Sequence, residues 1–187
     1  MCRSRRLFFI RNICIIFLLS IIISLTAFGF VGRNDGQTVQ GKEYLRIHIR
    51  ADSNEDEAQA VKYTVRDRVV EYLTPLVAEY EDMEESKKGI RSRLAEIENV
   101  AKKTLQEEGF SYGARAQIKQ EYFPTRVYDE YVLSAGEYTA LILELGKGKG
   151  DNWWCVVYPP LCFAATNTNV IYKSKIKEII ENWKKNP

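Results

Sequence analysis

The sequence contains one histidine, His48. Two of its four cysteines, Cys155 and Cys162, lie in one aromatic and apolar segment. A cysteine and a histidine form the nucleophile and base of some hydrolases when a third group orients the base. The sequence indicates no such group for Cys155 and His48. A zinc site needs at least three ligands at workable spacing, which these residues do not supply. The sequence therefore predicts no catalytic, metal or cofactor site, and His48 is typical of a polar surface.

The two cysteines lie seven positions apart, on either side of Pro159 and Pro160. Outside the cytoplasm, neighbouring cysteines commonly form a disulfide. The double proline could turn the chain back, but the spacing alone does not ensure disulfide geometry. A disulfide, two buried free thiols and a nucleophilic Cys155 are therefore three interpretations of the same pair.

The glycine-rich loop 146–150 carries Lys147 and Lys149. It lacks the spacing of a phosphate-binding loop and joins two predicted strands, so we expect a hairpin loop that could serve as a contact surface.

Four carboxylates could suggest a paired-acid hydrolase. Their positions suit helix capping and pairing with nearby basic residues better. They are Asp52, Asp56, Asp67 and Glu71.

Strands must position most of these residues. The first, 44–50, alternates Leu45, Ile47 and Ile49 with Arg46, His48 and Arg50, which predicts a strand buried on one face. Further strands are predicted at 114–123, 137–145 and 153–158, and the last two should pair as a hairpin.

Three helices are predicted. Asp52-Ser53-Asn54 should cap the first, whose apolar residues from 58 to 76 recur at spacings of three and four, with Pro75 in its last turn. The second runs through residue 105 and stops at Gly109, and the third covers 171–185. The order β-α-α-β-β-β-α predicts a single α+β domain with an antiparallel-rich sheet of about four strands packed on a helix pair.

The aromatic segment Asn152–Phe163 is predicted to serve both core and interface. Alternation places Trp153, Cys155 and Val157 on one face and Trp154, Val156 and Tyr158 on the other. A face left exposed would be an interaction patch. The candidate partner contacts are Trp153, Trp154, Tyr158, Phe163, Lys147 and Lys149.

The N-terminus predicts export. Residues 13–31 are 19 positions without a charge, preceded by four arginines, which fits a cleaved signal peptide or a retained membrane anchor. We therefore divide the chain into this segment (1–31), a flexible linker (32–43), an exported domain (44–163) and a C-terminal extension (164–187). After residue 32 the 23 basic and 25 acidic residues nearly balance, which argues against nucleic-acid binding.

Several blocks together resemble the stage II sporulation protein R family. They are His48-Ile49-Arg50-Ala51-Asp52-Ser53, Val65-Arg66-Asp67, Phe123-Pro124-Thr125, Ala135-Gly136-Glu137-Tyr138, Asn152-Trp153-Trp154-Cys155-Val156 and Tyr158-Pro159-Pro160-Leu161-Cys162-Phe163. The resemblance covers about residues 44–163. The chain departs from the family pattern at Asp52, where Asn is commoner, and at Ala164-Ala165, where an acidic residue is expected soon after Phe163.

The resemblance implies a signalling protein of endospore-forming bacteria and not an enzyme. Such a protein is exported from the forespore into the intermembrane space, where it is secreted or anchored. There it activates a membrane-embedded mother-cell protease that processes the sigma-E precursor. Two alternatives are a secreted hydrolase that uses Cys155 and His48, and a structural envelope-binding module.

Overall fold

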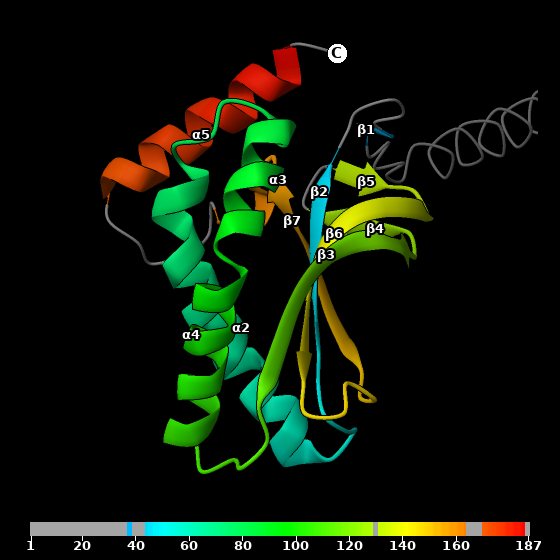
Figure 1. Cartoon of the computed structure of the whole chain (residues 1–187). Coiled ribbons are helices and arrows are strands. Elements are labelled where there is room, and N and C mark those ends of the chain that lie inside the picture. The colour runs from blue at the N-terminus through cyan, green and yellow to red at the C-terminus, as the bar shows by residue number, and fades with distance from the viewer. Residues whose placement is uncertain (1–36, 39–43, 129–130, 164–169, 186–187) are drawn as a thin grey trace, which may run out of the picture. The chain divides into compact units, whose positions relative to one another are not determined.

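The computed structural model describes residues 37–38, 44–128, 131–163 and 170–185 (Figure 1). The chain divides into two units, 1–37 and 38–187. The predicted signal peptide or anchor lies outside the described residues, as does most of the linker. Among the helices that are described, none is long and apolar enough to cross a bilayer.

The main sheet has four strands in the order β3-β6-β2-β7. Their bounds are β2 Leu45–Arg50, β3 Ala114–Phe123, β6 Gly136–Leu145 and β7 Asn152–Tyr158. The pairs β3/β6 and β2/β7 are antiparallel, but β2 and β6 are parallel, so the sheet is mixed. The α+β class and the four main strands are confirmed.

The predicted hairpin between the last two strands is wrong. β2 lies between β6 and β7 and pairs with both. The apolar side chains of β2, among them Ile47 and Ile49, are fully buried at the centre of the sheet. The glycine-rich loop therefore passes the end of β2 to reach the sheet's other edge.

Helices cover one face of the main sheet (Figure 1). They are α2 (Asp56–Val77), α3 (Met83–Ser92) and α4 (Leu94–Glu107). The second predicted helix is thus two helices that meet at Arg93. Asp82 caps α3 by accepting a hydrogen bond from the Glu85 N–H (2.8 Å). α4 ends before Gly109, whose positive φ of 83° allows the C-terminal turn.

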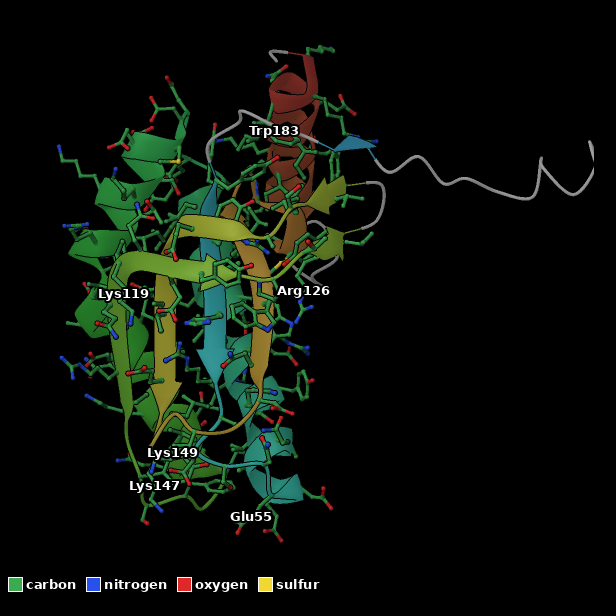
Figure 2. All side chains as sticks on the ribbon, turned by 90° about the vertical axis from the view of Figure 1, so that its right-hand side faces the viewer. Glu55, Lys119, Arg126, Lys147, Lys149 and Trp183 are labelled. Atoms are coloured by element: carbon green, nitrogen blue, oxygen red, sulfur yellow. A yellow bond between two sulfur atoms is a disulfide. The ribbon has the colours of Figure 1, made fainter. Side chains whose placement is uncertain are left out.

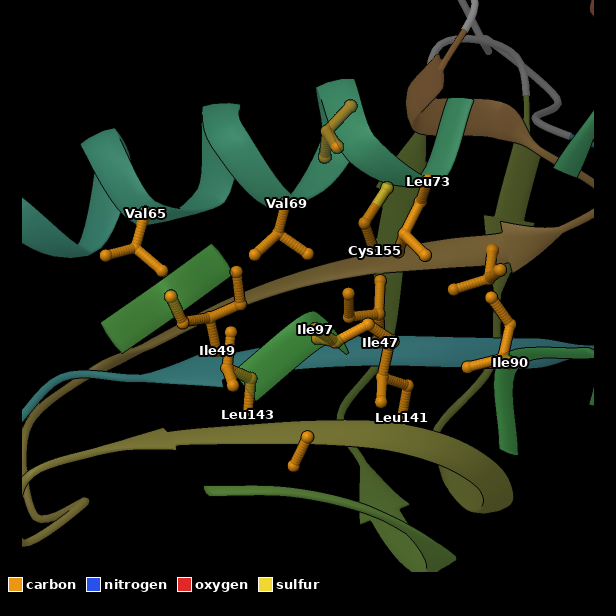
Figure 3. Close-up of a cluster of buried hydrophobic side chains, with 14 of the residues drawn as sticks. Ile47, Ile49, Val65, Val69, Leu73, Ile90, Ile97, Leu141, Leu143 and Cys155 are labelled. Atoms are coloured by element: carbon orange, nitrogen blue, oxygen red, sulfur yellow. The ribbon is translucent and has the colours of Figure 1, made fainter. Parts of the chain in front are cut away.

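The main core lies between the helices and this face of the sheet (Figure 3). The apolar stripe of α2, including Val65, Val69 and Leu73, faces Ile47 and Ile49 of β2. Each such side chain, when fully buried, contributes about 1.5–3 kcal/mol relative to an exposed one. This stripe confirms the sequence prediction, and α2 continues through Pro75 to Val77.

The opposite face of the sheet is also covered, which corrects the prediction of a half-exposed first strand. Arg46 and His48 are both fully buried. In Figure 2 the end of β3 and the start of β6 bend across this face, over β2 and β7. A short hairpin of β4 (Arg126–Tyr128) and β5 (Tyr131–Leu133) joins the two bent strands. We call this bent region with its hairpin, residues 119–128 and 131–140, the flap.

Three elements remain. The two-residue strand β1 (Gln37–Thr38) lies at the boundary between the two units. After β7 comes a 3₁₀ turn, η1 (Leu161–Phe163). The predicted C-terminal helix is present as α5 (Val170–Lys185), and its Ile176 is fully buried in the main core.

Candidate functional site

β7 carries most of the predicted site residues. Trp153, Cys155 and Val157 belong to the cluster on the helix side. Trp154 and Val156 pack in the clusters on the flap side. The predicted alternation holds up to Tyr158, where the pairing of β7 with β2 shifts register. This irregularity places Tyr158 in the helix-side core together with its neighbour.

Trp153 is half-buried at the start of β7, against the helix-side core. The Arg66 guanidinium carbon lies 5.7 Å from the Trp153 ring and 4.9 Å from the ring of Tyr63. Tyr63 is one of the exposed large hydrophobic residues. Cation–π attraction of this kind holds an arginine over the face of an aromatic ring. The result is a small cationic and aromatic surface on α2 and β7.

Trp154 is half-buried on the flap side. Its ring packs against His48 (centroids 4.8 Å apart) and edge-on against Phe123 (4.7 Å). The Arg126 guanidinium carbon, from β4, lies 5.7 Å from the Trp154 ring. Each tryptophan therefore has an arginine beside it, on opposite faces of one strand. No sequence pattern pairs these two arginines with the tryptophans, because they lie on other elements.

Two of the predicted contact residues are buried. Phe163 is fully buried in the helix-side core, and Tyr158 is only 8% exposed. The Tyr158 hydroxyl donates to the carbonyl of Glu81, and burial raises its pKa. Val156 is buried as well, so the strip from Trp154 to Tyr158 is not an exposed patch. The accessible part of β7 is its first half, where Asn152, Trp153 and Trp154 are half-buried.

The structure joins Cys155 and Cys162 as a disulfide, with Cα atoms 6.3 Å apart. That separation lies in the range that a disulfide requires. The turn η1 folds back after the double proline and brings Cys162 to β7. His48 is on the other face of the sheet from Cys155. A thiol and an imidazole on opposite faces cannot act together, so the Cys155–His48 hydrolase hypothesis has no geometric basis.

Arg46 is a fully buried cation held by aromatic rings. Its guanidinium carbon lies 4.2 Å from the Phe123 ring and 4.8 Å from the Tyr138 ring. Nη2 donates to the Tyr128 hydroxyl (2.9 Å), whereas Nε and Nη1 have no partner among the described residues. Burial raises the pKa of Tyr128, although Arg46 acts in the opposite direction. The flap thus closes over a charge that it only partly compensates.

His48 lies beside Arg46 under the flap. Its ring stacks on Phe123 (5.5 Å), and neither ring nitrogen has a partner in the described part of the chain. Burial, with the positive charge of Arg50 adding to it, lowers its pKa to about 4. His48 is therefore neutral at physiological pH, which corrects the prediction of a surface histidine.

Arg50 connects the sheet to the flap. Its Nη2 donates to Glu121 of β3 (2.6 Å) and its Nη1 to Glu144 of β6 (3.0 Å). Lys119 also pairs with Glu121 (3.0 Å). Burial opposes ionisation of Glu121, but the hydrogen bond from Lys119 and the charge of Arg50 lower its pKa overall. This network ties the bent end of β3 down over His48.

Lys147 and Lys149 are exposed in the loop at the start of β7 (Figure 2). They are separated from Tyr158 by the length of the strand, about 20 Å at 3.3 Å per residue. The Lys147 N–H donates to Asp52 Oδ1 (2.6 Å), which fixes the loop against the end of β2. Asn at position 52 offers the same oxygen, so this departure from the family pattern preserves the bond.

The predicted helix cap has a different role. α2 begins at Asp56, and its N-cap residue Glu55 makes no side-chain cap. Asn54 Oδ1 accepts from the Asp151 N–H (2.6 Å). These residues therefore fix the loop before β7 instead of capping α2. The local sequence pattern does not show that these residues bond to a loop distant in sequence and not to the helix.

The described residues contain no group of three His, Cys, Asp or Glu side chains that could hold a metal ion. The two tryptophans with their arginines form a surface suited to a protein partner, since Trp and Arg dominate the binding energy of many interfaces.

Comparison with known proteins agrees with the resemblance. The sequence model of the family described as stage II sporulation protein R matches residues 41–168. Stage II sporulation protein R of Bacillus subtilis (strain 168) is 41% identical over 119 residues, which cover 64% of this chain and 53% of that relative. The chain thus matches about half of the relative's length. No solved structure matches. The match to the family model spans most of the chain, and this protein belongs to the stage II sporulation protein R family.

Proposed function

We propose that this protein is an exported signal of endospore formation that switches on a membrane protease by contact. The protease is the mother-cell enzyme that processes the sigma-E precursor. Membership of the stage II sporulation protein R family supports a role in sporulation and is the observation that carries the proposal. The signal itself acts as a ligand and performs no reaction.

Two structural features fit this proposal. The Cys155–Cys162 pair joins β7 to η1, as expected of a domain that works in an oxidising compartment outside the cytoplasm. The arginine-flanked tryptophans provide a surface for a protein partner. Thiol-labelling mass spectrometry of the exported protein should find Cys155 and Cys162 unlabelled before reduction and labelled after it. Labelling before reduction would argue against the bonded pair.

Activation by contact follows from a difference in affinity. A ligand that binds the active state of the protease better than the inactive state shifts the population toward the active state. A tenfold difference in affinity corresponds to about 1.4 kcal/mol. Confinement in a narrow intermembrane space raises the effective concentration, so a modest interface is sufficient.

The test is reconstitution in a non-sporulating host that expresses the full chain, the membrane protease and the sigma-factor precursor. We expect precursor cleavage only when all three are present. Deletion of residues 1–31 should abolish cleavage, because the domain then stays in the cytoplasm. A chain with both His48→Ala and Cys155→Ala should retain cleavage if it folds. Absence of cleavage with the exported full chain would contradict direct activation.

A further inference from the structure

The main sheet has two edges, β3 and β7, and the described residues protect only one of them. The edge of β3 meets α4, where the Ala116 N–H donates to the Glu98 carboxylate (2.9 Å). This bond lowers the pKa of Glu98 and occupies an edge donor. β3 also carries exposed charged residues at Arg115 and Lys119. Charges and side-chain caps are the usual means by which a sheet edge is closed to other strands.

The edge of β7 is open in its first half. The Ala51 N–H donates to the Asp151 carbonyl (3.5 Å) and the Ala51 carbonyl accepts from the Gly150 N–H (2.9 Å), so Ala51 directs both backbone groups toward this strand, as residues of a hydrogen-bonded pair do. Hydrogen-bonded and non-hydrogen-bonded pairs alternate along an antiparallel ladder. The backbone groups of Trp153 therefore also point toward β2, whereas those of Asn152 and Trp154 point away from the sheet. Among the described residues, nothing bonds to these outward groups. Figure 2 shows no further strand beside β7.

This open edge lies between the two tryptophan–arginine pairs. Trp153 with Arg66 lies on the helix side, and Trp154 with Arg126 lies on the flap side. Within the described part of the chain, Arg126 forms no ion pair with a carboxylate. Arg66 pairs with the exposed carboxylate of Asp67 (2.7 Å), an interaction of small energy that a partner can replace. Unpaired backbone, aromatic anchors and positive charge therefore coincide in one place.

We propose that the edge of β7 at Asn152–Trp154 receives an extended segment of the membrane protease as an added strand. The segment would bond to the outward backbone groups, contact the two tryptophans and place a carboxylate near Arg126 or Arg66. This inference rests on the proposed function. A second copy of the chain fits less well, because antiparallel pairing of two β7 edges brings the arginines of both copies together.

Removal of one outward N–H tests the strand addition. Asn152→Pro deletes that donor while β2 keeps its bonds, since proline is tolerated on an outward-facing strand edge. Asn152→Ala makes the same side-chain loss but keeps the N–H. In the reconstituted host, we expect Asn152→Pro to lower the initial rate of precursor cleavage about tenfold relative to Asn152→Ala, at equal exported amounts.

Charge reversal tests the chemistry of the partner segment. Arg126→Glu should lower the cleavage rate at least fivefold, whereas Arg115→Glu at the protected edge should leave it unchanged. Equal rates for Asn152→Pro and Asn152→Ala, with cleavage intact in the unmodified chain, would overturn the edge proposal and leave the proposed function standing. Absence of cleavage with the unmodified chain would reject the proposed function first.

A crosslink identifies the occupant. A photoreactive phenylalanine derivative at Trp153 keeps an aromatic ring there and should crosslink to the protease. The same derivative at Arg115 should not. Crosslinks from position 153 to a second copy of the chain, or from position 115 alone to the protease, would each overturn the proposal. So would absence of any crosslink in cells whose precursor is being cleaved.

Discussion

The buried neutral His48 predicts that folding stability falls as the pH is lowered. The imidazole is fully buried and its pKa in the folded protein is about 4, against an ordinary value of 6.5. Because the folded pKa is the lower one, the unfolded chain binds the proton first. The stabilisation from a neutral His48 is therefore complete above pH 6.5 and declines as the pH approaches 4.

The magnitude follows from these two values. Relative to neutral pH, the lost free energy of unfolding is about 1 kcal/mol at pH 5.5 and about 2–3 kcal/mol at pH 4.5. The limit at lower pH is about 3 kcal/mol. The flap's Glu121 adds a loss in the same direction, because its pKa is also lowered in the folded state. A variant that lacks only the imidazole is therefore needed to separate the two.

Urea denaturation of residues 38–187, followed by tryptophan fluorescence between pH 7.5 and 4.5, measures this effect. His48→Gln occupies a similar volume and does not titrate. We expect its free energy of unfolding to fall by about 2 kcal/mol less than that of the unmodified protein over this range. Parallel curves for the two proteins would refute the assignment of a buried neutral imidazole. A variant that is less stable at every pH leaves the comparison of slopes intact.

Two further predictions concern the flap and the glycine-rich loop. Tyr128→Phe removes the hydroxyl that accepts from the buried guanidinium of Arg46 and should cost about 1.5–3 kcal/mol, whereas Arg46→Met should be neutral or stabilising, as measured by urea denaturation. A stabilising Tyr128→Phe would contradict the hydrogen bond. Gly146→Ala should cost about 2–3 kcal/mol, because φ is 55° and the added Cβ meets the side chain of Asp52. Gly109→Ala, with φ of 83° and open space around the Cβ, should cost only about 1 kcal/mol, and equal losses would rule out the clash.

The sequence predicted the elements whose signal is local. The α2 stripe was visible because Val65, Val69 and Leu73 recur with the helical period. β2 was visible because its residues alternate strictly. The break at Arg93 was missed, since the apolar period continues across it and only backbone geometry separates α3 from α4.

The pairing of strands and the burial of the second sheet face were not predictable in the same way. Alternation shows that Arg46 and His48 share a face, but not whether another part of the chain covers that face. The covering hairpin has strands of three residues each, too short for a periodic signal. The position of β2 between β6 and β7 depends on contacts between residues 94 to 113 positions apart, which no local pattern encodes.

For the candidate site, the sequence predicts Trp153 and Trp154 as contacts but does not predict which residues surround them. Their arginines come from α2 and β4, and only the fold brings these elements to β7. Tyr158 and Phe163 were chosen as contacts because they are aromatic, yet the register shift and the turn η1 direct them into the core. Aromatic character alone does not distinguish a core residue from an interface residue.

Two of the sequence blocks therefore act in different physical ways. The block that begins at His48 is buried or engaged in bonds: His48 lies under the flap, Arg50 holds the flap through Glu121, and Asp52 holds the loop. None of these groups is available to a partner without disrupting the fold. The Trp153-Trp154 block lies on the open edge that this framework holds in place. Binding at β7 thus depends on β2 indirectly, because the strand that fixes the flap and the loop also fixes the edge.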